Sequence, residues 1–314
     1  MKVLVTGGCG YVGSRLVPTL AELGFHVDVV DTQWFGNYLP KSSQINVIRK
    51  NVKDLTVEDL TSIKSVIHMA NIANDPSVEL NPSLSWETNV LDFMHLLEIS
   101  KQVGVQDFFY ASSGSVYGIK DEDKVTEDLA LVPISLYNKT KMIAERVLMS
   151  YENVFRCIAI RPATVCGYSP RMRLDVLINM FVWQAFSTGV IRVLGGEQIR
   201  PNIHIDDLSA VYIHLLQSPH VPSGAYNAGF ENISVLDAAR LVAAEIPSQI
   251  EINPSNDPRS YRQDSTKLMV TGFSPKRNVA QAISEIAEKL KRKELIDNEN
   301  WHTVRRMKTL GIGS

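Results

Sequence analysis

The sequence predicts an α/β fold in which a doubly wound parallel sheet is followed by a smaller α/β lobe. Apolar runs rich in valine and isoleucine alternate with helical patterns through the first half, which is typical of a parallel sheet covered by helices on both faces. These runs are KVLVTG, HVDVVD, INVIRK, SVIHMA, DFFYASS and FRCIAIRPA. After Pro162, glycine and proline become frequent and the strand-like runs shorten to IRVLGG, AYNAG and IEINP. We therefore expect a first domain over residues 1–165 and a second lobe over residues 166–314, with elements interleaved between them.

The composition is that of an ordinary globular protein. The chain has 314 residues, 45% of them hydrophobic and 21% charged, which is enough to bury a large core. A formal net charge of -2 leaves no basic surplus for the phosphates of a polynucleotide, so we do not expect nucleic acid as a partner. No apolar run approaches about 18 residues and no leader-like pattern precedes the first strand, so we expect a cytoplasmic protein without a membrane partner. The three cysteines lack metal-type spacing and are expected to be buried thiols.

Helical periodicity marks the first and the last helix that we expect. Between the first two strands, apolar residues recur at helical spacing, and Gly24 stands where a C-cap glycine would end the helix. Pro18 lies inside this segment, close enough to its start that we expect only a slight bend. The last helix carries apolar residues at spacings of four and three, so one face should pack on the body. The two apolar series are Val12, Leu16, Leu20 and Leu23, and Val279, Ile283, Ile286 and Leu290.

Glycine recurs every third residue, at Gly7, Gly10 and Gly13, between the first strand and the first helix. Glycine permits a tight turn and leaves room for a diphosphate, while the helix N-terminus presents backbone N–H groups to the anion. Asp31 ends the second strand, where an acid would accept hydrogen bonds from adenosine ribose hydroxyls and repel a 2′-phosphate. A glycine turn or an acid at a strand end can be purely structural, but strand, helix and acid together predict a Rossmann-type dinucleotide site that prefers NAD to NADP.

Tyr137 and Lys141 stand four residues apart, on one face of a predicted helix. A free phenol has a pKa near ~10, and a cation beside it lowers that value, so such a tyrosine can take a proton from an alcohol as hydride leaves. The segment Ser112–Gly118 directly follows the strand DFFYA, at the edge where open α/β sheets bind ligands. On its own, a Tyr-x-x-x-Lys pair could equally be two neighbours on an exposed helix. Together with the serine loop and the glycine loop, it predicts a catalytic pair.

These three motifs, in this order and spacing, resemble the extended short-chain dehydrogenase/reductase superfamily, and within it the NAD-dependent nucleotide-sugar epimerase/dehydratase family with its UDP-glucose 4-epimerases. The resemblance covers nearly the whole chain. It implies that Ser113 and Tyr137 are catalytic and that Lys141 is catalytic and binds the nicotinamide ribose. It also implies a homodimer formed through the helices that contain Asn89 and Tyr137.

The resemblance further implies which residues bind the cofactor NAD and which bind the substrate. Asn51 stands where the family usually has aspartate, which weakens one contact with the adenine. The implied cofactor residues are Gly7, Gly10, Tyr11, Val12, Gly13, Asp31, Asn51, Val52, Met69, Ala70, Asn71, Asn89, Ser112, Tyr137, Lys141 and Pro162. The implied substrate residues are Ser113, Ser115, Thr164, Arg173, Asn179, Arg200 and Arg259.

Arg200 opens the run RPNIHIDD, which resembles a family element whose arginine binds a nucleotide-sugar diphosphate. Within that run, His204 with Asp206 and Asp207 could suggest a metal site, but no further ligand cluster accompanies them and we expect none. Arg259 lies in the polar, proline-rich loop NPSNDPRSYRQDS, which suits a surface segment over a site.

The resemblance also indicates which reaction to expect. Related dehydratases place an Asp-Glu pair after the catalytic hydroxyl, whereas this chain has Gly114 and Ser115, so elimination of water is disfavoured. Thr164 replaces an asparagine that many epimerases use near the substrate phosphates, which leaves the substrate open. We expect an NAD-dependent epimerase that acts on a nucleoside-diphosphate sugar at C4 through a transient 4-keto sugar. The alternatives are a 4-ketoreductase or dehydrogenase that uses the same residues, and a non-catalytic NAD-binding sensor or scaffold.

Overall fold

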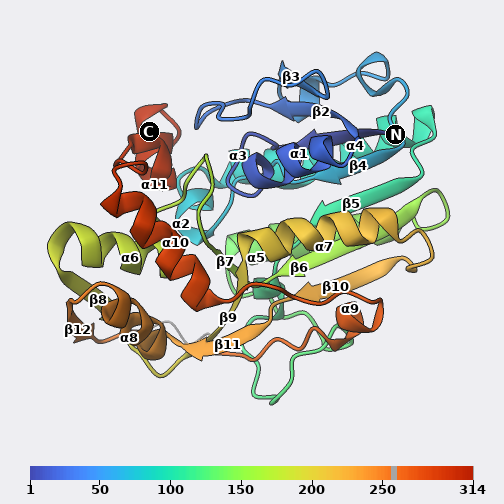
Figure 1. Ribbon diagram of the computed structural model, residues 1–314. Helices are drawn as coiled ribbons and strands as arrows, with labels where there is room; N and C mark the ends of the chain where they lie inside the picture. The colour runs from blue at the N-terminus through green and yellow to red at the C-terminus, as the bar shows by residue number, and fades with distance from the viewer. Residues whose placement is uncertain (256–259, 314) are drawn as a thin grey trace.

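The computed structural model describes residues 1–255 and 260–313, and its centre is a seven-stranded parallel sheet (Figure 1). The strands lie in the order β10-β6-β5-β4-β1-β2-β3, and each neighbouring pair is parallel. Their bounds are β1 (Lys2–Thr6), β2 (His26–Asp31), β3 (Ile45–Arg49), β4 (Ser65–His68), β5 (Asp107–Ala111), β6 (Arg156–Pro162) and β10 (Gly224–Ala228). The strand order reverses between β1 and β4, so the predicted doubly wound sheet is confirmed.

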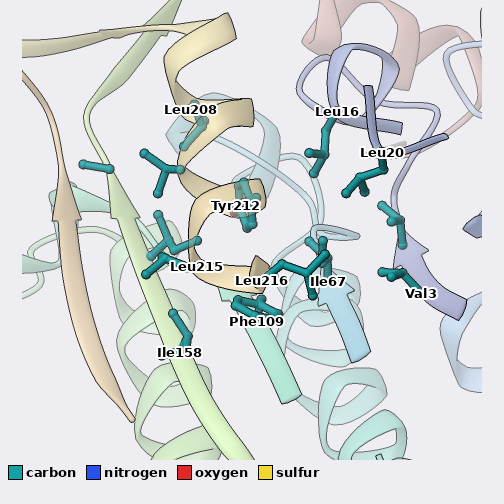
Figure 2. Packing of buried hydrophobic residues seen from close by; sticks show 14 of the residues in the cluster. Val3, Leu16, Leu20, Ile67, Phe109, Ile158, Leu208, Tyr212, Leu215 and Leu216 are labelled. Atoms are coloured by element: carbon teal, nitrogen blue, oxygen red, sulfur yellow. The ribbon is translucent and has the colours of Figure 1, made fainter. Parts of the chain in front are cut away.

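Helices cover both faces of this sheet, because successive residues of each strand point to opposite sides. On one face, α1 (Gly13–Glu22) and α7 (Ile205–Gln217) share one buried apolar cluster with the strands (Figure 2). Leu16 and Leu20 of α1 lie on the side of Val3, and Leu215 of α7 lies on the side of Ile158. The other face is covered by α4 (Asp92–Val103) and α5 (Leu136–Met149), which pack against the alternate residues of the same strands. As predicted, α1 continues through Pro18, and Gly24 follows its C-cap with φ of 86°.

The second lobe has its own apolar core and two small sheets. One sheet has the order β11-β9-β7 and the other pairs β12 with β8. Residues Val279, Ile283, Ile286 and Leu290 are all buried on α10 (Val279–Lys291), as their spacing predicts. The other elements of this lobe are β7 (Thr164–Cys166), α6 (Leu177–Thr188), β8 (Val190–Leu194), β9 (Ile199–His204), β11 (Glu231–Ser234), α8 (Val235–Glu245) and β12 (Gln249–Asn253).

Two features differ from the sequence-based expectation. The run AYNAG lies in β10, which is an edge strand of the large sheet, because α7 carries the chain back across that sheet before β10 pairs with β6. The helix over residues 279–291 is not the last, since α11 (Thr303–Thr309) follows it and buries Met307. We propose two lobes that divide near residue 165. Although α7 and β10 come later in the chain, they belong to the first lobe.

Short helical segments complete the described chain. The α-helical ones are α2 (Asp75–Val78), α3 (Pro82–Trp86) and α9 (Thr266–Val270), Glu87–Leu91 is a π-helical turn, and the 3₁₀ turns are Val52–Asp54, Glu58–Leu60, Gly114–Tyr117 and Glu299–Trp301. Over residues 1–255 and 260–313, no helix combines the length and apolar character that crossing a bilayer requires.

Candidate active site

A cavity of about 450 Å³ lies at the carboxyl ends of the strands of the large sheet. Gly7 and Gly10 follow β1, Asp31 ends β2, Ala70 follows β4 and Ser112 follows β5, and all of them line it. The cavity therefore occupies the crevice at which the strand order reverses, the place where open α/β sheets bind their ligands.

Backbone conformation and close backbone contacts require glycine at two positions of the glycine loop, Gly7 and Gly13. Gly7 has φ of 71°, and a Cβ added there would lie 2.6 Å from the backbone nitrogen of Ala70. A Cβ at Gly13 would lie 2.5 Å from Gly8, so the start of α1 could not meet the loop. Gly10 is less crowded, since its nearest atom would be the Gly7 oxygen at 3.0 Å. Gly10 lines the cavity, which leaves bare backbone where a ligand can approach.

Asp31 is fixed at the end of β2 by the backbone around it. Its Oδ2 accepts a hydrogen bond of 3.0 Å from the Cys9 N–H, and its Oδ1 accepts one of 2.7 Å from the Gln33 N–H. Burial raises the pKa of this carboxyl above its ordinary value. Asn51 and Val52 line the same cavity. Lys50, which precedes them, donates its backbone N–H to the Asp31 carbonyl. The end of the cavity predicted to bind the adenosine ribose is thus formed by the glycine loop, the end of β2 and the segment that contains Asn51.

Three predicted catalytic residues, Ser113, Tyr137 and Lys141, line the cavity together. Tyr137 and Lys141 are four residues apart on α5, and the Lys141 nitrogen lies 5.8 Å from the centre of the Tyr137 ring. Lys141 is 1% exposed and donates a hydrogen bond of 2.6 Å to the Ala111 carbonyl. The Ser113 hydroxyl lies 2.7 Å from that of Ser115, on the short turn that follows β5.

The pKa values of the helix pair are set mainly by burial. Burial raises the pKa of the Tyr137 phenol to about 12, while the Ser113 hydroxyl and the Arg173 charge act to lower it. Burial also lowers the pKa of the Lys141 ammonium to about 7. We expected Lys141 to lower the pKa of Tyr137, but its ammonium donates to the Ala111 carbonyl, and the positive charge that lowers the pKa of Tyr137 is that of Arg173.

Lys141→Met is expected to flatten the pH dependence of folding stability. The pKa of Lys141 falls from its ordinary 10.5 to about 7 in the folded chain, so the unfolded chain binds more protons between these values and stability rises with pH across them. That contribution is present above pH ~10.5 and is lost as the pH falls through ~7. Urea midpoints measured from about pH 6 to pH 10 should rise less in the variant. Equal slopes in the two proteins would contradict the depressed pKa.

A buried polar network supports the serine loop from behind. Ser112 donates a hydrogen bond of 2.6 Å to Glu145, which forms an ion pair with Arg161, and both of these side chains are 5% exposed. Arg161 also donates a hydrogen bond of 2.6 Å to the Tyr117 hydroxyl. This network ties β5, α5 and β6 together next to the catalytic residues. Sequence reasoning missed it, because the partners are distant in the chain.

Two predicted site residues lie behind the cavity wall. The Asn89 amide bonds both backbone groups of Ile72, at 2.7 and 3.1 Å, and the Thr140 hydroxyl at 3.2 Å. The Asn179 amide accepts from the Gly167 N–H and donates to the Tyr11 hydroxyl and the Arg173 carbonyl. Neither asparagine lines the cavity, and both hold residues that surround it.

The remaining predicted residues divide as follows. Apart from Asn89, every predicted cofactor residue lines the cavity, namely Gly7, Gly10, Tyr11, Val12, Gly13, Asp31, Asn51, Val52, Met69, Ala70, Asn71, Ser112, Tyr137, Lys141 and Pro162. Of the predicted substrate residues, Ser113, Ser115, Thr164 and Arg173 line it. Arg200 lies on β9 outside the lining, and Arg259 falls outside the described residues.

Several residues that line the cavity were not in the predicted set. They come from segments without a recognisable motif and include Trp34, Phe35, Arg171, Tyr212, Tyr261, Thr303 and Met307. Thr303 and Met307 belong to α11, which is too short to show a helical pattern. Arg171 stands in the run SPRMRLDVLINMFV, whose arginines could have been ligands or surface residues. Only a structure could separate these possibilities.

His204 has a structural role at the start of α7. Its Nδ1 accepts a hydrogen bond of 3.1 Å from the Asp206 N–H, and its Nε2 lies 3.6 Å from Glu285. Across the described part of the chain, no group of three or more histidine, cysteine, aspartate or glutamate side chains could hold a metal ion.

A glycine loop, a Tyr-x-x-x-Lys pair and a serine loop that face one cavity define an extended short-chain dehydrogenase/reductase. The chain belongs to the NAD dependent epimerase/dehydratase family, whose model matches residues 3–229. The predicted superfamily, enzyme class and cofactor NAD are therefore confirmed. The lining fits that cofactor, because Gly10 offers bare backbone and the Asn71 Oδ1 is buried without a partner among the described residues.

Similar proteins act on UDP-sugars. The chain is 27% identical over 309 residues to the UDP-glucose 4-epimerase of Lactobacillus helveticus, covering 88% of this chain and 92% of the relative. It is 30% identical over 303 residues to UDP-glucuronic acid decarboxylase 2 of Arabidopsis thaliana, covering 90% of this chain and 66% of the relative. Among solved structures, MoeE5 in complex with UDP-glucuronic acid and NAD superposes with a TM-score of 0.84 at 27% identity, covering 93% of this chain and 100% of that one.

Proposed function

We propose that the protein is an NAD-dependent 4-epimerase of a UDP-sugar. The observation that carries this proposal is the convergence of Ser113, Tyr137 and Lys141 on the cavity that also contains the glycine loop. The UDP-glucose 4-epimerases among its relatives support both the reaction and uridine as the base.

The side chains have distinct roles in the proposed reaction. Because burial raises the pKa of Tyr137 to about 12, the phenolate is a minor form at neutral pH, and Tyr137 acts in that form. The phenolate removes the proton of the C4 hydroxyl, and Ser113 hydrogen-bonds that oxygen. NAD, when bound, would supply a reversible hydride acceptor for C4. The 4-keto sugar then rotates in the site, so that the opposite face of C4 receives the hydride. Tyr137 returns the proton to the C4 oxygen in the same step. One proton and one hydride leave and return in each cycle, so the epimerisation consumes no cofactor.

The turn after Ser113 opposes a dehydratase. Gly114 is buried, and a Cβ added there would lie 3.0 Å from the Gln263 Oε1 and 3.2 Å from the Tyr261 hydroxyl. A carboxylate at this position would therefore meet two polar side chains before it reached a substrate. The Ser115 hydroxyl, in turn, faces Ser113 and cannot replace an acid. Hydride chemistry at a single carbon is the reaction that these residues favour.

The experiment is a product analysis with a panel of UDP-sugars: UDP-glucose, UDP-galactose, UDP-N-acetylglucosamine and UDP-glucuronic acid. The purified protein is incubated with each sugar, and the products are followed by NMR together with NADH absorbance. A 4-epimer formed without net NADH supports the proposal. Stoichiometric NADH formation or consumption would indicate the dehydrogenase or ketoreductase alternative, and release of carbon dioxide would indicate a decarboxylase. No turnover of any sugar would favour the sensor or scaffold.

Arg200→Ala is expected to raise KM for the UDP-sugar while NAD affinity stays unchanged. Arg200 lies on β9 beside Ile199, whose carbonyl accepts from the backbone of the cavity-lining Tyr261. Loss of charge-assisted hydrogen bonds to a diphosphate should raise KM roughly 10- to 100-fold. Arg192→Ala, which alters an exposed arginine of the same lobe, is the matched control. Weaker NAD binding in the Arg200 variant would mean that this arginine serves the cofactor.

We also propose a homodimer formed through the helices that contain Asn89 and Tyr137. Leu91, directly before α4, and Met94, in its first turn, are 57% and 42% exposed, so this face offers apolar surface for a partner. Light scattering should give twice the chain mass, and Leu91→Glu should reduce that mass toward one chain. A single-chain mass for the unmodified protein would refute the dimer.

The cysteines suit a reducing compartment, and we propose a cytoplasmic location. Cys9, Cys157 and Cys166 are free thiols, and each is buried. Burial raises the pKa of the Cys9 and Cys157 thiols to about 12, which keeps them protonated and unreactive.

A further inference from the structure

Arg171 is a buried cation that lines the cavity and has no hydrogen-bond or ion-pair partner among the described residues. It is 3% exposed, and its guanidinium carbon lies 4.2 Å from the centre of the Phe35 ring. Within residues 1–255 and 260–313, its guanidinium makes no hydrogen bond and no ion pair, and its Nε is completely buried. Burying an arginine in this way is costly unless an anion compensates it.

The other cations on the cavity wall differ from Arg171 in this respect. Lys50 pairs with Asp59 at 2.6 Å, and Arg173 pairs with Asp175 at 2.9 Å. Lys141 bonds the Ala111 carbonyl. Among the described residues that line the cavity, Arg171 is the one cation whose side chain makes neither a hydrogen bond nor an ion pair.

The backbone of Arg171 is fastened to the start of α1. Its N–H donates a hydrogen bond of 3.2 Å to the Ser14 hydroxyl, in the first turn of that helix. The neighbouring Ser169 hydroxyl lies 2.7 Å from the same hydroxyl and donates to the Tyr11 carbonyl. The loop that carries Arg171 is therefore held against the glycine loop by hydrogen bonds from two of its residues.

The side chain of Arg171 packs on the segment that follows Asp31. Phe35, over which the guanidinium stacks, belongs to that segment, and the Asp31 carboxylate interacts electrostatically with Arg171. Arg173, two residues along, instead interacts with the charge of Tyr137 at the catalytic end. Arg171 therefore lies near Asp31 at one end of the cavity, and Arg173 lies near Tyr137 at the other.

We propose that Arg171 binds the diphosphate of NAD from the side opposite the α1 N-terminus. Arginine suits a diphosphate, because its planar fork can donate two parallel hydrogen bonds to phosphate oxygens. The helix N-terminus and the guanidinium would hold the diphosphate between them. Burial and the neighbouring Arg173 lower the pKa of Arg171 to about 9. A bound anion would therefore also stabilise the charged form of this guanidinium. This inference needs only NAD binding, which family membership supplies, and is independent of the epimerase proposal.

The test measures binding to the full chain after bound nucleotide has been removed. NAD, ADP, adenosine and UDP are titrated by calorimetry into the unmodified protein, Arg171→Met and Arg171→Lys. Arg171→Met should weaken NAD and ADP by roughly 10- to 100-fold. Adenosine and UDP should bind as before, because neither places a diphosphate beside α1. Arg171→Lys keeps the charge but not the fork, and should give an intermediate loss.

Thermal unfolding separates this role from a structural one. Because Arg171 makes no hydrogen bond or ion pair with the described residues, and methionine can still pack on Phe35, Arg171→Met should unfold at the same temperature as the unmodified protein or higher. The rise in melting temperature that NAD produces should shrink in the variant. Unchanged NAD affinity in both variants would overturn the proposal, as would weaker binding of UDP with NAD unaffected. Should Arg171→Met fail to fold, the Arg171→Lys titrations decide by the same criteria.

Discussion

Tyr137→Phe is expected to lower turnover of the UDP-sugar by on the order of 10²- to 10⁴-fold, with the fold and NAD affinity unchanged. The substitution removes only the phenolic oxygen, the group that must accept and return the substrate proton. The ring itself packs among Ile72, Val78 and Met307, and phenylalanine preserves those contacts. The measurement compares kcat for product formation with NAD affinity and melting temperature in the same preparations.

Tyr110→Phe is the matched control for that experiment. Tyr110 is 1% exposed, its ring lies 4.9 Å from the Lys141 nitrogen, and its hydroxyl has no hydrogen-bond partner among the described residues. Loss of this hydroxyl should leave turnover intact and stability equal or higher, because a buried group without a partner is removed. If Tyr137→Phe kept its activity, another group would be the base. If Tyr110→Phe also lost activity, the effect of Tyr137 would not be specific.

Glu145→Ala is expected to lower the free energy of unfolding by about 3–5 kcal/mol. It leaves the Arg161 guanidinium buried without its carboxylate, and it also removes the acceptor of the Ser112 hydroxyl. Urea unfolding followed by circular dichroism measures the change. Asp237→Ala breaks the pair with Arg240, in which both side chains are more than half exposed, and should leave the midpoint essentially unchanged.

A double variant identifies the origin of the Glu145 effect. Glu145→Leu with Arg161→Met removes both charges, so no unpaired buried cation remains. This variant should be distinctly more stable than Glu145→Ala. A loss of less than about 1 kcal/mol in Glu145→Ala would show that the buried pair does not hold this region together. A double variant no better than the single one would assign the loss to packing.

The parts of the site that the sequence predicted are those encoded by local patterns. Gly7, Gly10 and Gly13 report a turn between one strand and one helix, and the four-residue spacing of Tyr137 and Lys141 places them on one helix face. Each signal is complete within a few residues. The alternation of apolar runs likewise predicted the parallel sheet, because a strand buried on both faces has that composition wherever its neighbours lie.

The parts that the sequence did not predict depend on contacts between distant segments. The β10 strand reads as a short apolar run, and only the path of α7 assigns it to the large sheet. Met307 reaches the cavity from a short helix near the end of the chain. Arg171 resembles any surface arginine until the hydrogen bond from its backbone to Ser14 places it on the cavity wall. Asn89, which the resemblance places among the cofactor residues, does not line the cavity, and its amide bonds Ile72 and Thr140.

The central claim is that one site oxidises and then reduces the same carbon of a UDP-sugar. The most direct test uses a UDP-sugar deuterated at C4, with the protein at catalytic concentration, unlabelled NADH present in solution and the products analysed by NMR. Our account predicts a C4-inverted product that retains deuterium at C4, because the hydride that leaves C4 returns to C4 from the bound cofactor. An inverted product that carries protium at C4, or a 4-keto product that accumulates with deuterated NADH, would contradict it.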